Sequence, residues 1–423
     1  MGKTNLALDC AGREALLPVD EAFAAIVGEA AVVSGRERVA VWNSLGRVAA
    51  LDIATGISMP PFDHAAVDGY GLTAADLDRP PPLRLGLVGR IAAGGTTADI
   101  RVGSGEAVRL YTGAVVPSDV AAVVLEERCR VEPGAVVLTV AVPDGDNIRR
   151  RGEDVARHSV IVEGGSLLDA RHVAILAAAG LGEIEVRRRV RVALISTGNE
   201  LRGPGETLDP GSIYDSNLPM LGALVARPWV DVVATEHVDD QAEALAGTLR
   251  ALAGEVDVIL SSGGAAGSDT DHTARAIVAA GGRASALRVA LRPGKPSVIG
   301  RIGSAAVLGL PGNPVAAMVN FLLFGRALLL RCAGAMAERP RGQPAVTAGP
   351  IFHAPGRTEM APAGIVGFEG DGRPRIEKQG RGGSARLRPL VLADGIIEIP
   401  SEAGDLRPGE AIAFHPFHGA LSP

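Results

Sequence analysis

Two cations enclose a Pro–Gly turn in the stretch ALRPGKPSVIG, residues 290–300. The turn has the composition of a phosphate-binding loop, but a P-loop would carry Gly in place of Val289 and Ser or Thr in place of Pro296. The chain has a formal net charge of −6, so any anionic ligand must be held by local cations. Arg292 and Lys295 are therefore candidates for an anion site, and a structural ion pair is the alternative for each.

Two Gly-rich turns, STGNEL and SSGGAAGSDTD, each follow an apolar run. Glycine lets the backbone approach a ligand closely, and free N–H groups at the start of a helix suit a phosphate. Either turn alone is equally consistent with a tight connection, whereas two of them on successive strands favour a binding site. The candidate binding residues in these turns are Thr197, Gly198, Ser262, Gly263 and Gly264.

Carboxylates accompany the turns: Glu200 in the first, Asp240 in VDDQ and Asp271 in SDTDHT. Acidic groups beside a phosphate site usually indicate a divalent cation, because a cation reconciles the two negative charges. Helix capping is the alternative for Asp240 and Asp271, and Glu200 has a similar structural alternative.

The composition limits the classes of function. Aromatic residues make up only 3% of the chain, which together with the acidic charge disfavours a nucleic-acid partner. Cys10, Cys129 and Cys332 form no CxxC pair and no zinc set, so we expect reduced thiols in a cytosolic protein.

The sequence predicts neither a signal peptide nor a membrane span. The N-terminal residues MGKTNLALDC lack an apolar core and a cleavage site. The most apolar stretch, residues 316–330, is interrupted by Asn320, Gly325 and Arg326, which favours a buried helix. We therefore expect a cytoplasmic protein with no membrane partner.

The 423 residues are enough for about two to four domains. Three apolar runs, VRVALIS, VDVILSS and AAVLGL, alternate with helical patterns and predict a parallel sheet covered on both faces. Ligands bind such sheets at the carboxyl ends of the strands. The predicted segments are a helical domain in two parts (1–55 and 147–188), an inserted β-rich module (56–146), an α/β domain (189–331) and a C-terminal β domain (332–423).

A family resemblance covers nearly the whole chain and rests on blocks that occur in order: PPFDHAAVDGYGL, RLYTGAVVP, NIRRRGEDV, STGNEL, IYDSN, SSGG, DHT, LRPGKP, GLPGNPV and GGSARLRPL. The sequence resembles the molybdopterin molybdenumtransferases, the group of bacterial MoeA and the gephyrin E-domain. The resemblance implies a multidomain α/β fold. Its parts are a central three-layer molybdopterin-binding domain, a helical N-terminal domain, an inserted β-rich module and a C-terminal domain like a small β-barrel. It also implies an elongated homodimer.

The implied activity is insertion of molybdate into adenylylated molybdopterin with release of AMP. Mg²⁺ would bridge phosphate oxygens, and catalysis would rest on positioning and electrostatic stabilisation without a protein nucleophile. Arg292 and Lys295 would hold molybdate or a substrate phosphate. Expected partners are a molybdopterin adenylyltransferase and the recipient molybdoenzymes or their chaperones.

The resemblance assigns roles to residues across the chain. The implied catalytic residues are Asp68, Thr112, Asp154, Glu200, Asp240 and Asp271. The resemblance also implies substrate-binding residues outside the two Gly-rich turns and the Pro–Gly stretch. They are Arg149, Asp215, Pro311, Asn313, Pro314 and Ser384. The implied metal ligands are Asp215, Asp240, Asp271 and Glu200. The family's cleft lies between the sheet domain of one subunit and the β module of its partner.

Local alternatives exist for the residues of the β module and its flank. Asp68 precedes Gly69 and could be a turn residue. Thr112 could be an ordinary hydroxyl, Asp154 could pair with the adjacent arginines, and Arg149 could lie on a solvated face.

The sequence also departs from the family pattern. Ala266 stands where the family offers a hydroxyl, Asn199 replaces an aspartate, and His158 stands where glycine is common. These departures motivate a second hypothesis, a degenerate paralogue that binds the cofactor or a partner without turnover. A third hypothesis is a molybdopterin adenylyltransferase, which shares the sheet-domain fold and a Gly-rich loop.

Overall fold

The computed structural model describes residues 16–263, 270–380, 383 and 385–417. The chain divides into two compact units. The first comprises the described parts of Met1–Leu51, Gly164–Asp169 and Ile184–Pro423, and the second comprises Asp52–Glu163 and Ala170–Glu183.

The first unit is centred on a six-stranded sheet of order β16-β13-β17-β21-β20-β18. The three apolar runs form neighbouring parallel strands, as predicted, and β16 is parallel to β13. The sheet is mixed rather than wholly parallel, because β20 runs antiparallel to both of its neighbours, β21 and β18. The two residues between β20 and β21 allow a hairpin but no crossover. The strands are β13 (Val190–Thr197), β16 (Val230–Val238), β17 (Val258–Ser262), β18 (Arg283–Arg288), β20 (Pro296–Ile302) and β21 (Ala305–Leu310).

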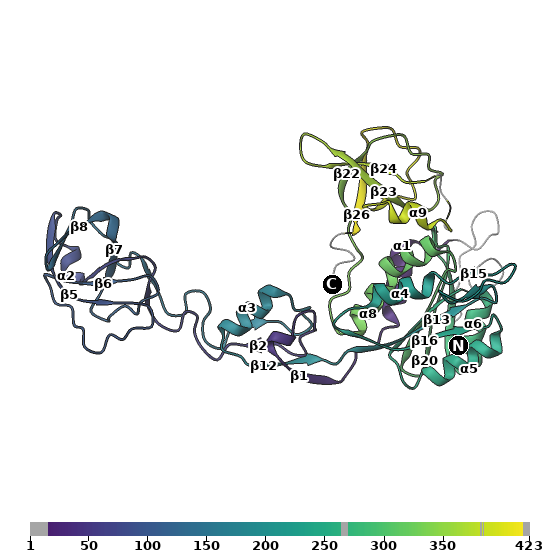
Figure 1. Ribbon diagram of the computed structural model, residues 1–423, viewed down its shortest axis with the longest axis horizontal. Coiled ribbons are helices and arrows are strands. Elements are labelled where there is room, and N and C mark those ends of the chain that lie inside the picture. The colour runs from purple at the N-terminus through teal and green to yellow at the C-terminus, as the bar shows by residue number, and fades with distance from the viewer. Residues whose placement is uncertain (1–15, 264–269, 381–382, 384, 418–423) are drawn as a thin grey trace. The chain divides into compact units, whose positions relative to one another are not determined.

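Helices cover both faces of this sheet, which confirms the three-layer prediction (Figure 1). Adjacent strand residues enter opposite cores, since side chains alternate along a strand. Leu194 packs in the core that contains Leu221 of α4, whereas Ile195 packs with Leu249 of α5 and Ile277 of α6. The helices are α1 (Val19–Gly28), α4 (Asn217–Val225), α5 (Ala242–Leu252) and α6 (Thr270–Ala279).

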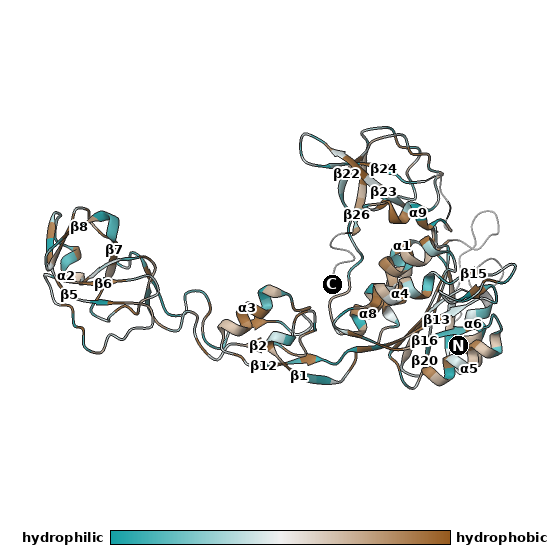
Figure 2. Cartoon of the chain, in the orientation of Figure 1, coloured by the Kyte–Doolittle hydropathy of each residue, from teal (hydrophilic) through white to brown (hydrophobic). Residues whose placement is uncertain are grey.

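The apolar stretch near residue 320 forms a continuous helical segment from Pro314 to Cys332. It comprises α7 (Pro314–Asn320), a π-helical turn η4 (Phe321–Gly325) and α8 (Arg326–Cys332). Its length and composition would suffice to cross a membrane, but 83% of its most apolar window is buried inside the protein. Figure 2 shows hydrophobic residues along α8. The prediction of a buried helix is confirmed.

The N-terminal domain is β-rich, so the prediction of a helical domain in 1–55 and 147–188 was wrong. Only α1 and α3 (Ala170–Ala178) are regular α-helices there among the described residues, with a short 3₁₀ turn η1 (Val41–Asn43). Glycine and serine interrupt the Ala- and Val-rich runs before a helix can extend, and the β-branched residues pair with strands far away in sequence. The pairs are β1 (Arg36–Ala40) with β12 (Glu183–Arg187), and β2 (Ile53–Ala54) with β11 (Val160–Val162).

The second unit contains a six-stranded sheet of order β7-β4-β6-β5-β9-β8, which confirms the β-rich module. Strand β4 lies between β7 and β6, and a Cβ atom at Gly69 would lie 2.1 Å from the carbonyl oxygen of Val124 on β7. Glycine is therefore required beside Asp68. The elements are β3 (His64–Ala65), β4 (Gly69–Leu72), α2 (Ala74–Leu77), β5 (Leu83–Ile91), β6 (Glu106–Leu110), β7 (Ala122–Leu125), η2 (Glu126–Arg128), β8 (Cys129–Glu132), β9 (Ala135–Leu138) and β10 (Ile148–Arg149).

The C-terminal residues form a small barrel, as predicted. Its strands pair in the order β23-β24-β22-β26-β25, and β25 pairs back to β23 and closes the ring. The short strand β19 (Leu291–Arg292) also pairs with β23 and so attaches the Pro–Gly stretch to the barrel. The elements are β22 (Gln343–Thr347), β23 (Thr358–Phe368), β24 (Pro374–Lys378), α9 (Leu387–Val391), β25 (Gly395–Ile399) and β26 (Ala411–Pro416).

Candidate functional site

The carboxyl ends of β13, β17 and β21 meet at one cavity of about 390 Å³, which we call the strand-end cavity. Six of the turn residues expected to gather at this edge of the sheet line it: Thr197, Gly198, Ser262, Gly263, Asn313 and Pro314. Pro311, predicted with them, is not among the described lining residues. Glu200, Asp215 and Asp240 line it as well. The sheet thus brings together segments that lie more than a hundred residues apart.

The turns after β13 and β17 touch one another. Gly263 has a φ of 106°, and a Cβ atom there would lie 2.1 Å from the Thr197 carbonyl oxygen. Only glycine fits this contact and this backbone conformation. The sequence suggested that glycine here lets the backbone approach a ligand. In the structure, the glycine at residue 263 also lets the two turns approach one another.

Asn217 ties the turns after β17 and β21 together, and the sequence reasoning missed it. Its Nδ2 donates to the Ser262 hydroxyl at 2.8 Å and to the Gly312 carbonyl at 2.7 Å. Ser262 in turn donates to the Pro311 carbonyl at 3.2 Å. The Ser262 hydroxyl and the Pro311 carbonyl therefore serve an internal network. The only signal in the sequence was the position of Asn217 at the end of the IYDSN block.

Asp215 follows β15 (Ile213–Tyr214), which pairs with β14 (Leu201–Arg202), and caps α4. Its Oδ1 accepts hydrogen bonds from the backbone N–H groups of Asn217 at 2.9 Å and Leu218 at 3.0 Å. One carboxylate oxygen is thus engaged in capping, and the side chain is buried.

Asp240 does not cap α5: Gln241 is at the N-cap, and among the described residues no backbone N–H of the first turn donates to the Asp240 carboxylate. The capping alternative for this residue is therefore wrong. Its backbone N–H donates to the side-chain oxygen of Asn199 at 3.0 Å. Asn199, one of the departures from the family pattern, thus holds Asp240 at the rim of the strand-end cavity.

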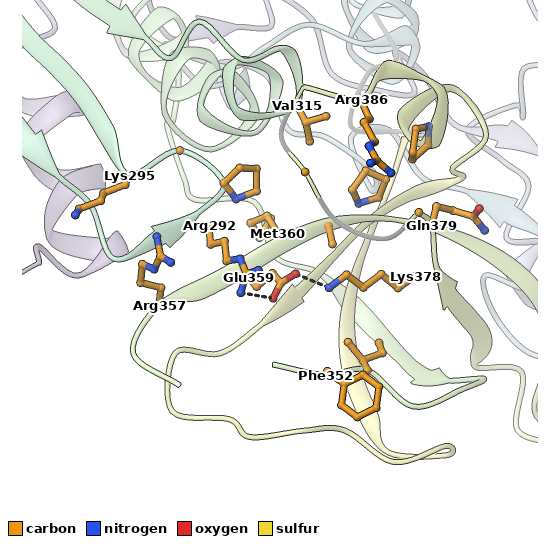
Figure 3. Close-up of a pocket in the computed structure, with 18 of the residues that line it drawn as sticks. Arg292, Lys295, Val315, Phe352, Arg357, Glu359, Met360, Lys378, Gln379 and Arg386 are labelled. Carbon is orange, nitrogen blue, oxygen red and sulfur yellow. Dashed lines mark hydrogen bonds and ion pairs between the residues drawn. The ribbon is translucent and has the colours of Figure 1, made fainter. Parts of the chain in front are cut away.

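A second cavity of about 670 Å³ lies between the Pro–Gly stretch, the barrel and the segment around residues 383–389; we call it the cation cavity. Five cations of the described residues line it: Arg292 and Lys295 from the Pro–Gly stretch, and Arg357, Lys378 and Arg386 from the barrel and its flank. Glu359 is the one carboxylate among its described lining residues (Figure 3). The sequence reasoning identified the first two cations and missed the other three.

The Pro–Gly turn is fixed onto the helix beneath it. Gly294 has a φ of 114°, and a Cβ atom there would lie 2.0 Å from Nδ2 of Asn320. Asn320 is fully buried, donates to the Ala316 carbonyl at 2.8 Å and accepts from the Ser297 hydroxyl at 2.7 Å. This buried amide therefore determines where Arg292 and Lys295 project.

The two cations of the turn differ in their surroundings. Arg292 lies 3.8 Å from the Glu359 carboxylate, so the ion-pair alternative applies to it in part. Lys295 has no carboxylate partner in the described part of the chain. Partial burial, followed by repulsion from Arg288 and Arg357, lowers the pKa of Lys295. The environment of Lys295 thus favours a bound anion.

In the second unit, Asp68 and Thr112 lie together. Asp68 Oδ1 accepts hydrogen bonds from the Thr112 N–H and hydroxyl, both at 2.7 Å. The backbone hydrogen bond, with the hydroxyl second, lowers the pKa of Asp68. Both side chains are exposed, so the pair presents one Asp68 oxygen to solvent.

The arginine run of the second unit is paired with carboxylates other than Asp154. Arg149 pairs with Glu153 at 2.9 Å and Arg150 pairs with Asp63 at 2.8 Å. Asp154 is exposed and does not pair with Arg149 or Arg150. Three predicted positions fall outside the description: Gly264, Ser384 and the side chain of Asp271.

Comparison with known proteins assigns the family. Family models match residues 17–180 (MoeA N-terminal region, domains I and II), 193–331 (probable molybdopterin-binding domain) and 344–417 (MoeA C-terminal region, domain IV). A molybdopterin molybdenumtransferase 2 of Mycobacterium tuberculosis is 32% identical over 86% of this chain and 91% of its own. The chain belongs to the MoeA family of molybdopterin molybdenumtransferases.

Other MoeA relatives agree with this assignment. The molybdopterin molybdenumtransferase of Haemophilus influenzae is 28% identical over 96% of this chain and 100% of its own. A solved molybdopterin biosynthesis MoeA protein of Pyrococcus horikoshii superimposes with a TM-score of 0.75 at 31% identity, covering 95% of this chain and 99% of its own. The family's members are transferases.

The donor set of the strand-end cavity bears on the metal ion that the MoeA family implies. Among the described residues, no group of three or more His, Cys, Asp or Glu side chains is placed to hold a metal. Mg²⁺ rarely needs such a cage, because it is commonly bound by one or two carboxylates together with substrate phosphates and water. Glu200, Asp240 and the second oxygen of Asp215 supply hard oxygen donors that fit this mode.

Proposed function

We propose that this protein inserts molybdate into adenylylated molybdopterin and releases AMP. The observation that carries the proposal is the pairing of two cavities of opposite chemistry on either side of one segment. Ala385 and Leu387 line the strand-end cavity, whereas Gly383, Arg386 and Pro389 line the cation cavity. One cavity offers carboxylates and Gly-rich turns, and the other offers five cations for a small dianion.

The strand-end cavity is the proposed site for adenylylated molybdopterin. The turns at Gly198 and Gly263 let backbone N–H groups approach its phosphates. Mg²⁺, held by one or two of the carboxylates of Glu200, Asp240 and Asp215 together with substrate phosphates, would neutralise phosphate charge and stabilise the departing AMP. Asn217 keeps the turns at a fixed separation, so the contribution of the protein is positioning and electrostatic stabilisation.

The cation cavity is the proposed site for molybdate. The dianion would be repelled by the carboxylates of the strand-end cavity, and Lys295, Arg357 and Arg386 give it a separate place. The segment that contains Arg386 borders both cavities, so the proposed molybdate site and the proposed pterin site lie on either side of it.

We further propose that the active form is a homodimer in which the Asp68–Thr112 pair of one copy completes the strand-end cavity of the other. An exposed apolar surface in the first unit supports a second copy. Trp42 is 84% exposed and Leu45 is 57% exposed. Leu51 and Leu167 are exposed on the same two segments, which hydrogen bonds join at Gly46–Leu168 and Ala49–Ser166. A contiguous exposed apolar patch commonly marks an interaction surface, and these hydrogen bonds hold the two segments side by side.

The proposed reaction takes place in the cytoplasm. An adenylyltransferase would supply the substrate, and apo-molybdoenzymes or their chaperones would take the product. The name shared by the relatives that span most of the chain favours insertion over the adenylyltransferase alternative.

Incubation with adenylylated molybdopterin, Mg²⁺ and molybdate tests the proposal. We expect molybdate-dependent AMP release and one equivalent of molybdenum in the pterin product. Tight binding without AMP release would instead identify a degenerate paralogue. ATP-dependent adenylylation of free molybdopterin would identify an adenylyltransferase.

A further inference from the structure

Glu359 occupies an unusual position for a carboxylate. It is 5% exposed and lines a cavity that five cations surround. One of its oxygens pairs with Lys378, and the other, Oε2, faces Arg292 at 3.8 Å (Figure 3). That distance is too long for a hydrogen bond, and the buried Oε2 atom has no hydrogen-bond partner among the described residues.

The backbone fixes this arrangement. Arg292 and Glu359 are register partners on the parallel strands β19 and β23. The N–H of Thr358 donates to the Ala290 carbonyl at 2.8 Å and closes the same ladder. Glu359 therefore remains beside Arg292 whether or not an anion is bound.

Glu359 divides the cations of the cavity into two groups. Arg292 and Lys378 face its carboxylate, whereas Lys295, Arg357 and Arg386 have no carboxylate partner in the described part of the chain. A dianion beside any of these three cations shares the cavity with Glu359, so its attraction to the five described cations is opposed by one negative charge. Removing that negative charge would strengthen the attraction.

We propose that Glu359 is a resident counter-ion that competes with the bound oxyanion and keeps it exchangeable. The inference rests on the proposed function, in which molybdate must leave the cation cavity to reach the substrate in the strand-end cavity. A cavity whose cations faced no carboxylate would bind the dianion more tightly and would slow its release toward the strand-end cavity. Glu359 weakens binding in the ground state and so sets the affinity of the cavity for its anion.

Replacing Glu359 with Gln tests this proposal, using two tetrahedral anions of similar size and different charge. Molybdate carries two charges and perrhenate carries one. Coulomb energy is proportional to the charge of the ligand, so the logarithm of the gain in affinity should be twice as large for molybdate. We expect Glu359→Gln to bind molybdate about tenfold more tightly and perrhenate about threefold more tightly, as measured by isothermal titration.

Because Glu359→Gln leaves Lys378 half-buried without its partner, further variants control for loss of stability. Glu359→Gln/Lys378→Met restores the wild-type charge of the cavity and should return both affinities toward wild type. Lys378→Met alone should weaken molybdate binding. Glu369→Gln is the matched control on the same barrel, because Glu369 forms an exposed pair with Arg375, and it should leave both affinities unchanged.

Steady-state kinetics gives a second readout. Glu359→Gln should lower the KM for molybdate without raising kcat. Weaker or unchanged molybdate binding in a folded Glu359→Gln protein would overturn the proposal, as would equal gains for the two anions. A different result would contradict the proposed function itself: Lys295→Met, in a protein that still contains Glu359, would leave molybdate affinity unchanged.

Discussion

The two cavities of the first unit differ in their chemistry. The strand-end cavity presents carboxylates, backbone amides and small side chains, and in the proposed function it accepts phosphates with a metal ion. Among its described residues, the cation cavity presents five cations and a single carboxylate, which suits a bare oxyanion. A dianion and a nucleotide phosphate repel one another, so separate cavities let both be bound before they meet. The comparison teaches how, in the proposed function, one protein could sort its ligands by charge before any bond is made.

The largest effect should come from disturbing the base of the cation cavity. In Gly294→Ala the new Cβ atom would lie 2.0 Å from Asn320 Nδ2, at a φ of 114°. Backbone strain costs about 1–3 kcal/mol and the clash adds to it. We expect the free energy of unfolding to fall by about 3 kcal/mol or more. Molybdate binding should be lost, whereas binding of adenylylated molybdopterin should be unchanged.

Denaturant unfolding and ligand titration measure these two quantities. Gly247→Ala on α5 is the control, since a Cβ atom there has no heavy atom within 4 Å and alanine favours a helix. A Gly294→Ala protein of normal stability would show that Asn320 does not determine the position of the turn.

The next prediction concerns the second unit. If the strand-end cavity is completed by another copy, Asp68→Ala and Asp271→Ala should each be inactive alone. After subunit exchange, half of the dimers are mixed and each of these keeps one intact site, so roughly a quarter of wild-type activity should return. AMP release from the mixed sample measures the recovery. If verified heterodimers recovered no activity, the site would have to be formed within one copy.

Deleting one charge from the cation cavity should have an intermediate effect. Lys295→Met keeps the aliphatic stem and removes the ammonium group. A charged hydrogen bond contributes about 1.5–3 kcal/mol, so molybdate affinity should fall about tenfold to a hundredfold. The melting temperature should stay constant or rise, because repulsion from Arg288 and Arg357 is relieved. A lower melting temperature with unchanged affinity would identify a structural ion pair.

The smallest effect is the dependence on pH. The pKa of Lys295 is lowered by burial and by neighbouring arginines, so the unfolded chain keeps this proton over an alkaline range in which the folded protein has released it. The unfolded state then binds more protons, and the free energy of unfolding should rise with pH across that range. Molybdate affinity should fall across the same range as the charge is lost. Lys295→Met should lack both trends.

The sequence predicted the strand-end cavity better than the cation cavity, for a physical reason. The strand-end cavity follows from local pattern and sheet topology: three apolar runs place Thr197, Ser262 and Asn313 at one edge wherever the rest of the chain lies. Its internal ties were not predictable, because the hydrogen bonds of Asn217 depend on the orientation of one side chain.

The cation cavity depends on contacts between segments distant in sequence. Lys295 and Arg357 meet only because β19 pairs with β23, and no periodicity in the sequence specifies that pairing. The same limit explains the N-terminal error: the strands β1 and β12 pair across more than a hundred residues, and the local Ala-rich pattern suggested a helix instead.

The central claim is that the oxyanion and the pterin nucleotide bind in separate cavities, and anomalous diffraction from crystals soaked in molybdate tests it most directly. The account predicts an anomalous peak in the cation cavity among Lys295, Arg357 and Arg386, and no such peak in Lys295→Met crystals. A peak over the turns at Gly198 and Gly263, with the cation cavity free of molybdenum, would contradict it.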